Sequence, residues 1–224
     1  MITDTFIKER PFTYVDRWAE QEIAPEIWIE KEALAKTIER WTLGLNIPIR
    51  VNRGYSSWTF IYNNVLNLRR TLTKHKKVVI FYLGDLDPSG VDIQRFLKEA
   101  LEYFGLDENV VEFKRLAITP EQVEKYNLPP RPEDAETLAK LERDTRTKSY
   151  KYDYIVELDA LMAYVPEEFK RIVREAIMSV WDRETYEKLK ERKEEIDRLL
   201  DEMISNYIEK AKEKLLEQLG LKGE

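Results

Sequence analysis

Residues 77–90 read KVVIFYLGDLDPSG, and this stretch decides which fold the sequence favours. Its first half, Lys77–Leu83, is apolar on both faces of an extended chain, as is typical of a central strand in a parallel sheet. Two acidic residues, Asp85 and Asp87, follow at once. Because alternate side chains of an extended segment point the same way, both carboxylates can address one metal ion. The alternative is that they only cap a helix and turn the chain, since Asp is common in turns.

Strand-like and helix-like segments alternate on both sides of this stretch. Runs of β-branched and aromatic residues predict strands over residues 26–30, 47–52, 77–83 and 110–118. Helical spacing of apolar residues covers 31–41, 58–72 and 90–104, and Thr119-Pro120-Glu121 is a good helix start. The alternation predicts an α/β fold with a parallel, Rossmann-like sheet flanked by helices.

The chain divides by composition into three parts. Residues 1–25 are expected to be an N-terminal arm, 26–165 the α/β domain, and 166–224 a helical C-terminal extension. Within the domain, residues 127–150 are polar and begin with prolines, which predicts an excursion on the surface. Residues 152–158 (YDYIVEL) regain strand character.

The helical extension carries an apolar stripe. Its members recur at alternating four- and three-residue spacing, beginning with Ile196, Leu200, Met203 and Tyr207. Two interpretations stay open. The helix can pack on its own domain, or two such helices can pair and make the protein a homodimer.

The composition excludes several classes of site. The chain of 224 residues has no cysteine and a single histidine, His75, so disulfides, thiolate metal sites and cysteine nucleophiles are excluded and a Ser/His/Asp triad is disfavoured. Any metal must then be held by oxygen, which favours Mg²⁺, Mn²⁺ or Ca²⁺. The net charge of -6 argues against a broadly basic surface for nucleic acid. The charged fraction of 36%, rich in Glu and Lys, is typical of a thermophile.

The sequence also bears on the compartment. It has no apolar run of about 18 residues, which a membrane helix would require. Its first residues, MITDTFIKERPFTY, lack the basic-then-apolar plan of a signal peptide. These features predict a soluble cytoplasmic protein without membrane association.

A third carboxylate, Glu30, ends the strand candidate EIWIE. If that strand lies parallel beside the strand 77–83, Glu30 reaches the same sheet edge as Asp85 and Asp87, where open α/β sheets bind ligands. Three carboxylates around one point repel one another unless a cation joins them. The alternative is a first-turn charge that matches the dipole of the following helix.

Three short motifs together resemble the Toprim fold, in the form found in the A subunit of topoisomerase VI and its relatives that make meiotic double-strand breaks. The motifs are Glu30-Lys31 after the first strand, Arg53-Gly54-Tyr55-Ser56 after the second, and Asp85-Leu86-Asp87-Pro88-Ser89-Gly90 after the third. The match is also similar to small Toprim proteins with GYSS, DPSG and ELDAL segments, and it covers about residues 26–165. It departs from the topoisomerase because about 25 residues precede the first strand, too few for the winged-helix domain that carries the tyrosine nucleophile. We interpret Tyr55 as a packed aromatic residue of the turn.

The resemblance implies a Mg²⁺ site, in which Mn²⁺ can substitute, at Glu30, Asp85 and Asp87. The implied chemistry is phosphoryl transfer at a nucleic-acid backbone, with the aspartates as ligands and the glutamate as general acid, general base or further ligand. Phosphate contacts are expected from Lys31, Arg53 and Ser89, which also stands where it can cap the next helix.

Glu157 and Asp159 repeat the arrangement of two acidic residues one apart, after the strand-like segment 152–158. They can supply ligands for a second metal or orient the first set of ligands. The alternative is that they end a strand and cap a helix, and the sequence does not separate the two.

The leading expectation is therefore an enzyme, a Mg²⁺-dependent endonuclease or nickase that acts on DNA, or RNA, with water as the nucleophile. A second reading is a non-catalytic subunit that binds metal and DNA while a protein partner supplies the missing activity. A third is a structural α/β protein without a metal.

Overall fold

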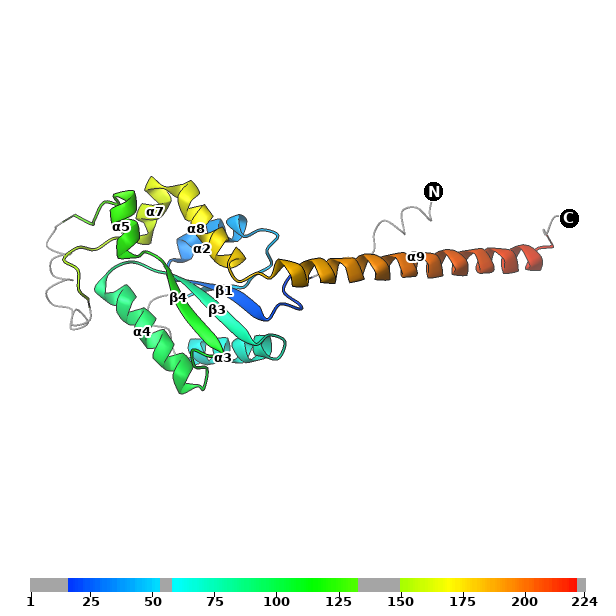
Figure 1. The fold of residues 1–224 in the computed structure, drawn as a ribbon, viewed down its shortest axis with the longest axis horizontal. Coiled ribbons are helices and arrows are strands. Elements are labelled where there is room, and N and C mark those ends of the chain that lie inside the picture. Colours follow the sequence, from blue (N-terminus) through cyan, green and yellow to red (C-terminus); the bar gives the residue numbers. More distant parts are fainter. Residues whose placement is uncertain (1–15, 53–57, 133–149, 221–224) are drawn as a thin grey trace. The chain divides into compact units, whose positions relative to one another are not determined.

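The computed structural model describes residues 16–52, 58–132 and 150–220. It contains a four-stranded, all-parallel sheet with the strand order β2-β1-β3-β4 (Figure 1). The strands are β1 (Ile23–Ile29), β2 (Ile49–Val51), β3 (Lys77–Leu83) and β4 (Val111–Ala117). The expected α/β fold class, a parallel Rossmann-like sheet flanked by helices, is confirmed.

Strand β3 lies inside the sheet, as its apolar sequence predicts. It pairs with β1 from Ile23↔Lys77 to Ile29↔Leu83 and with β4 on its other side. Six of its seven residues are buried, which explains why both of its faces are apolar.

Strand β1 begins at Ile23, before the expected residue 26. Pro25 lies inside it although proline cannot donate a ladder hydrogen bond. The register explains this, because β2 joins β1 only from Ile27 onward, opposite Ile49. At Pro25 the strand therefore has only β3 beside it, and an N–H on its other side is not needed.

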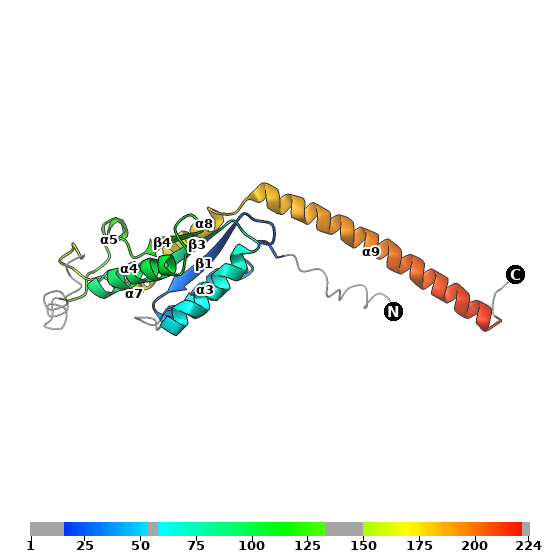
Figure 2. The same cartoon turned by 90° about the horizontal axis from the view of Figure 1, so that it is seen from below.

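Helices cover both faces of the sheet (Figures 1 and 2). On one face, Trp28, Ile80 and Tyr82 pack with Leu68 and Leu97 in one apolar cluster. On the other face, Trp41 and Phe169 meet edge to face with ring centroids 5.2 Å apart. The first face is covered by α3 (Trp58–Leu72) and α4 (Pro88–Tyr103), and the second by α2 (Glu32–Trp41) and α8 (Pro166–Met178).

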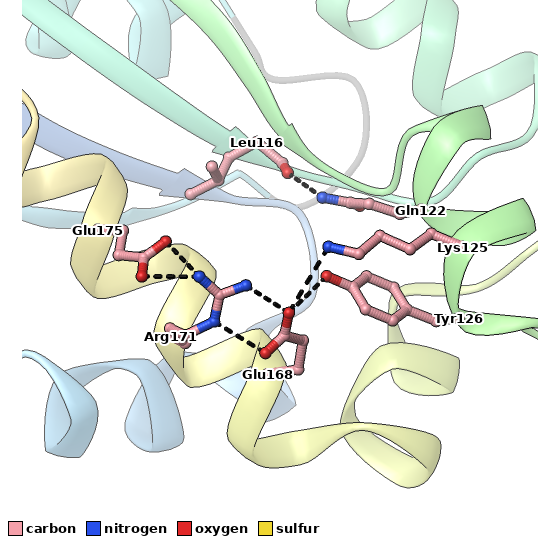
Figure 3. Close-up of polar contacts among 7 residues, drawn as sticks. All are labelled: Leu116, Gln122, Lys125, Tyr126, Glu168, Arg171 and Glu175. Carbon is pink, nitrogen blue, oxygen red and sulfur yellow. Dashed lines mark hydrogen bonds and ion pairs between the residues drawn. The ribbon is translucent and has the colours of Figure 1, made fainter.

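The helix α5 (Pro120–Tyr126) starts where the sequence predicts. Thr119 forms a capping box with Gln122, in which each side chain accepts a hydrogen bond from the backbone N–H of the other residue. The Gln122 side chain also donates to the Leu116 carbonyl at the end of β4, 2.8 Å away (Figure 3). This contact fixes α5 to the sheet.

A polar network joins α5 to α8, as Figure 3 shows. The Tyr126 hydroxyl donates to Glu168 Oε1 at 2.8 Å, and Lys125 Nζ lies 3.8 Å from the same oxygen. The Arg171 guanidinium bridges Glu168 and Glu175 on α8. Hydrogen bonds from Arg171 and Tyr126 hold the pKa of Glu168 at about 2, so this carboxylate stays charged at neutral pH.

The segment 152–158 is not a strand, contrary to the sequence-based expectation. Its pairing with other described residues is limited to one antiparallel bridge between Val156 and Leu86, and helix α7 (Leu158–Tyr164) begins at its end. The apolar residues Ile155 and Val156 are buried. They pack under the loop that follows β3 and do not join the sheet. Burial at this place requires apolar residues just as a strand does, so the sequence pattern is the same.

The chain forms two compact units. The sheet unit lies within residues 21–181 and includes α8; the described residues of the other unit are 16–20 and 182–220. In the described part of the second unit, the Arg17 guanidinium lies 5.8 Å from the Tyr186 ring and Glu20 forms an ion pair with Arg192. These contacts fix the short N-terminal segment against the start of α9 (Arg183–Gln218), a helix of 36 residues.

Among the residues that the structure describes, none of the helices combines the length and the apolar character needed to cross a lipid bilayer.

Candidate functional site

The carboxyl ends of β1 and β3 bring Glu30 and the two aspartates to one edge of the sheet. Ile29 and Leu83 are partners in the register, and the Glu30 N–H donates to the Leu83 carbonyl at 2.9 Å. Glu30 therefore follows β1 at the level where Asp85 and Asp87 follow β3. The structure places these three side chains in one region, at the edge where ligands bind to open α/β sheets.

The Glu30 carboxylate is held between the two strand ends. It accepts a hydrogen bond from the Tyr82 hydroxyl at 3.3 Å and another from the Asp85 backbone N–H. Burial and then the charges of Asp85 and Asp87 raise its pKa from 4.5 to about 7. Near neutral pH this carboxyl group is therefore about half protonated when no cation is bound.

Asp85 faces the start of α7. Its Oδ1 accepts from the Leu158 backbone N–H at 2.7 Å, which links two segments far apart in the sequence. Burial raises the pKa of Asp85, the Leu158 N–H opposes this, and the charge of Asp87 adds to the rise. The charges of both aspartates also raise the pKa of Glu30, so the three carboxyl groups repel one another.

Asp87 caps helix α4. Its Oδ1 accepts from the Gly90 N–H at 2.6 Å and from the Ser89 hydroxyl at 2.9 Å, and only 3% of the residue is exposed. The expectation that Ser89 caps this helix is therefore wrong. Pro88 takes the first helical position, where its missing N–H costs nothing, so the aspartate one residue earlier is the cap.

Two glycines allow the acidic loop to fold this closely. A Cβ on Gly90 would lie 2.4 Å from the Asp85 carbonyl oxygen, and a Cβ on Gly84 would lie 2.6 Å from the Tyr82 ring. Neither contact is possible for another residue without moving the loop. The packing of the site therefore requires residues without a side chain at positions 84 and 90.

A half-buried arginine on β4 supports the loop. The Arg115 guanidinium donates to the carbonyls of Gly84 (3.0 Å), Asp85 and Ile118 (2.7 Å), and lies 5.6 Å from the Tyr82 ring. Burial lowers its pKa, and the negative charges of nearby groups, including the three carboxyl groups, oppose that effect.

Lys31 lies beside two acidic side chains. Its Nζ pairs with Asp159 and lies 3.6 Å from Glu157 Oε2, and Arg131 lies 3.8 Å from the other oxygen of Glu157. Glu157 occupies the N-cap position of α7 but makes no side-chain cap hydrogen bond. The two acidic residues therefore serve here as partners of Lys31, and the charge of Glu157 also raises the pKa of Asp85.

Asn52 is a residue of this edge that the sequence analysis missed. Its backbone N–H donates to the Ile29 carbonyl at 2.7 Å, next to Glu30. The side chain is fully buried, and within the described ranges neither of its amide atoms has a hydrogen-bond partner. A buried amide without partners is costly. Its only sequence signal is a polar residue at a strand end, which does not distinguish it from a turn residue.

Arg53 and Tyr55, in the turn after β2, lie outside the described residues. Over residues 16–52, 58–132 and 150–220, no three acidic or histidine side chains are gathered as a ready-made metal-ligand set. The donors that do converge are oxygen atoms of partly buried, mutually repelling carboxyl groups, and this chemistry fits a hard divalent cation.

Comparisons of this chain with models of protein families, with curated proteins and with solved structures found no match.

Proposed function

We propose that the chain is a Toprim-like protein that performs Mg²⁺-dependent phosphoryl transfer on nucleic acid, most simply the cleavage of one DNA strand. One observation supports this proposal above the others: Glu30, Asp85 and Asp87 follow two adjacent parallel strands at the same end of the sheet, close enough for the charges of both aspartates to raise the pKa of Glu30. A stable fold gains nothing from such mutual repulsion. A cation and its phosphate ligand supply the missing attraction.

In this proposal Asp85, Asp87 and Glu30 hold Mg²⁺, or Mn²⁺ in its place. When bound, the ion supplies stabilisation of the negative charge on the phosphate oxygens. Glu30 is either a further ligand of the ion or, when it carries a proton and does not contact the ion, the general acid that passes this proton to the departing sugar oxygen; in both cases it accepts a hydrogen bond from the Tyr82 hydroxyl, and the attacking water loses its proton to solvent. Water is the proposed nucleophile.

Positive side chains complete the proposed site. Arg115 keeps the acidic loop in place through its hydrogen bonds to the loop carbonyls. Lys31 can contact a phosphate only after it leaves its acidic partners, so we propose that Glu157 and Asp159 orient this lysine rather than bind a second metal. Arg53 and Ser89 remain proposed phosphate contacts. We propose the cytoplasm as the compartment in which it acts.

The test is a nicking assay on supercoiled plasmid with Mg²⁺ or Mn²⁺. The wild-type chain is expected to convert supercoiled to open-circular DNA, and Asp85→Asn to lose at least about a hundredfold of that rate. Asp107→Asn is the matched control, because Asp107 also accepts from a backbone N–H, that of Asn109, but precedes β4 at the opposite edge of the sheet. Equal rates for the wild type and Asp85→Asn would rule the proposal out.

A second candidate function is a subunit that binds metal and DNA without cutting. It is favoured because Asp85 and Asp87 each commit one oxygen to a backbone N–H, as structural aspartates do. In that case fluorescence anisotropy shows Mg²⁺-dependent DNA binding that Asp85→Asn abolishes, while the plasmid stays intact until a protein partner is added.

A further inference from the structure

Helix α9 carries a long apolar stripe that no described part of its own unit buries. Not one residue of the helix is buried. Nine apolar side chains are between 36% and 76% exposed: Ile196, Leu199, Leu200, Met203, Ile204, Tyr207, Ile208, Leu215 and Leu219. Exposed apolar surface of this extent marks an interaction site.

The described N-terminal segment contacts the helix near its beginning. Residues 16–20 contact it through Arg17 at Tyr186 and through Glu20 at Arg192. The exposed stripe begins after these contacts, at Ile196. Helices owe most of their stability to the packing of an apolar face, so a stripe of this length requires a partner surface.

The apolar residues of the helix as a whole have a midpoint. They run from Tyr186, ahead of the exposed stripe, to Leu219 at the C-cap, and the centre of that interval falls between Glu202 and Met203. A second copy of the helix, placed antiparallel and related by a two-fold axis at this centre, would cover the stripe along its whole length. In such an arrangement, residue i of one copy meets residue j of the other, and j meets i.

The charges beside the stripe match this arrangement. At 3.6 residues per turn, six charged residues lie within about 60° of one another along one flank. Equal distances from the same midpoint relate them in three pairs, and each pair joins opposite charges: Lys188 with Glu217, Arg192 with Glu213, and Glu195 with Lys210. Charges that flank an apolar seam select the partner and its orientation.

We propose that α9 is a dimerisation helix, which pairs antiparallel with α9 of a second copy about a two-fold axis between Glu202 and Met203. The occupant of the stripe is the same chain, because its flanking charges are complementary to themselves under that one rotation. The inference rests on α9 alone and is independent of the proposed function.

The first test measures the molar mass of the full chain by light scattering during size-exclusion chromatography. The wild type is expected at twice the mass of one chain, and Ile204→Glu at the mass of one. Ser205→Glu is the control. It introduces the same charge, but Ser205 lies on the opposite side of the helix from the stripe. Circular dichroism checks that the helix persists in each variant. A monomeric wild type, or a dimer that survives Ile204→Glu with its helix intact, overturns the proposal.

The second test addresses the orientation. Glu195→Lys and Lys210→Glu, each alone, place like charges opposite each other and are expected to raise the dimer dissociation constant roughly tenfold. The double variant restores the match and the affinity. No restoration in the double variant overturns the antiparallel register.

Cross-linking gives an independent readout of the orientation, because the chain has no cysteine. Chains carrying Glu195→Cys and chains carrying Lys210→Cys are mixed and treated with a short bis-maleimide reagent. Cross-links are expected in the mixture and not in either variant alone. Cross-links of the Glu195→Cys variant with itself would indicate a parallel pair and contradict the proposal.

Discussion

The Tyr82 hydroxyl lies 3.3 Å from Glu30 Oε2 and joins the aromatic core of the sheet to its acidic edge. Burial, and then the charge of Glu30, raise the pKa of Tyr82 well above its usual range. The phenol therefore keeps its proton and donates a hydrogen bond to the carboxyl group. Arg115, 5.6 Å from the same ring, supplies a fixed positive charge beneath the site. These contacts make the protonation of Glu30 a property of the folded state, with measurable consequences.

Glu30→Gln is expected to stabilise the protein at alkaline pH. The pKa of Glu30 is raised from 4.5 to about 7 on folding, so its contribution is fully present below pH 4.5 and is lost as pH rises through 7. At pH 8 the variant should exceed the wild type by about 2–3 kcal/mol in free energy of unfolding, and at pH 4.5 by little. Urea denaturation at the two pH values measures this.

The control is Glu112→Gln. Hydrogen bonds from Lys114 and Lys77 lower the pKa of Glu112, so this variant should lose stability at pH 8 rather than gain it. Mg²⁺ added to the wild type at pH 8 should reduce the advantage of Glu30→Gln. Parallel pH profiles for Glu30→Gln and the wild type would contradict the raised pKa.

Arg115→Met is expected to destabilise the sheet unit by about 3 kcal/mol or more, because it leaves buried carbonyl groups without donors and acidic groups without a nearby positive charge. Arg95→Met, which removes an arginine whose side chain is 51% exposed from surface ion pairs, should cost less than about 1 kcal/mol. Equilibrium unfolding in urea compares the two. Similar small losses would show that Arg115 does not support the loop.

Asn52→Leu is expected to raise the free energy of unfolding by about 1–2 kcal/mol, because both amide atoms are buried without partners in the described structure. Asn64→Leu is the matched control. Its side chain donates to the Phe60 carbonyl at 3.0 Å, so the same change should cost about 1 kcal/mol. Thermal denaturation distinguishes the two signs. If the proposed cleavage takes place at this edge, Asn52→Leu should also reduce nicking; a loss of stability would instead reveal a partner for this amide.

The link between α5 and α8 should weaken in acid. The pKa of Glu168 is lowered to about 2, so its contribution is present above the pKa of an ordinary glutamate and is lost as pH falls towards 2. Glu168→Gln should therefore unfold at lower urea than the wild type at pH 7, with the difference vanishing near pH 2. Glu167→Gln is the control. The side chain of Glu167, the residue before Glu168, is 88% exposed and lies 3.8 Å from Lys170 Nζ. A difference that persists at pH 2 would show that Glu168 acts through packing.

Much of the fold is readable in the sequence because its signals are local. The apolar run Lys77–Leu83 is the buried strand β3, and the helix predicted over 58–72 is α3 with the same ends. Thr119-Pro120 starts α5 through a capping box. The errors arise where burial without sheet pairing imitates a strand, as in Ile155 and Val156, and where the cap of α4 falls on Asp87 instead of Ser89.

The sequence by itself determined the parallel sheet and the residue types at its edge, since strand patterning and strand-end carboxylates depend on neighbours in the chain. Only the tertiary structure decided how those residues are paired: Glu30 with Tyr82, Lys31 with Asp159, and Arg115 with the loop after β3. Each pair joins residues on different secondary-structure elements, and their contacts are fixed by the packing of strands and helices. No local pattern records such distances, and the pKa of Glu30 follows from them.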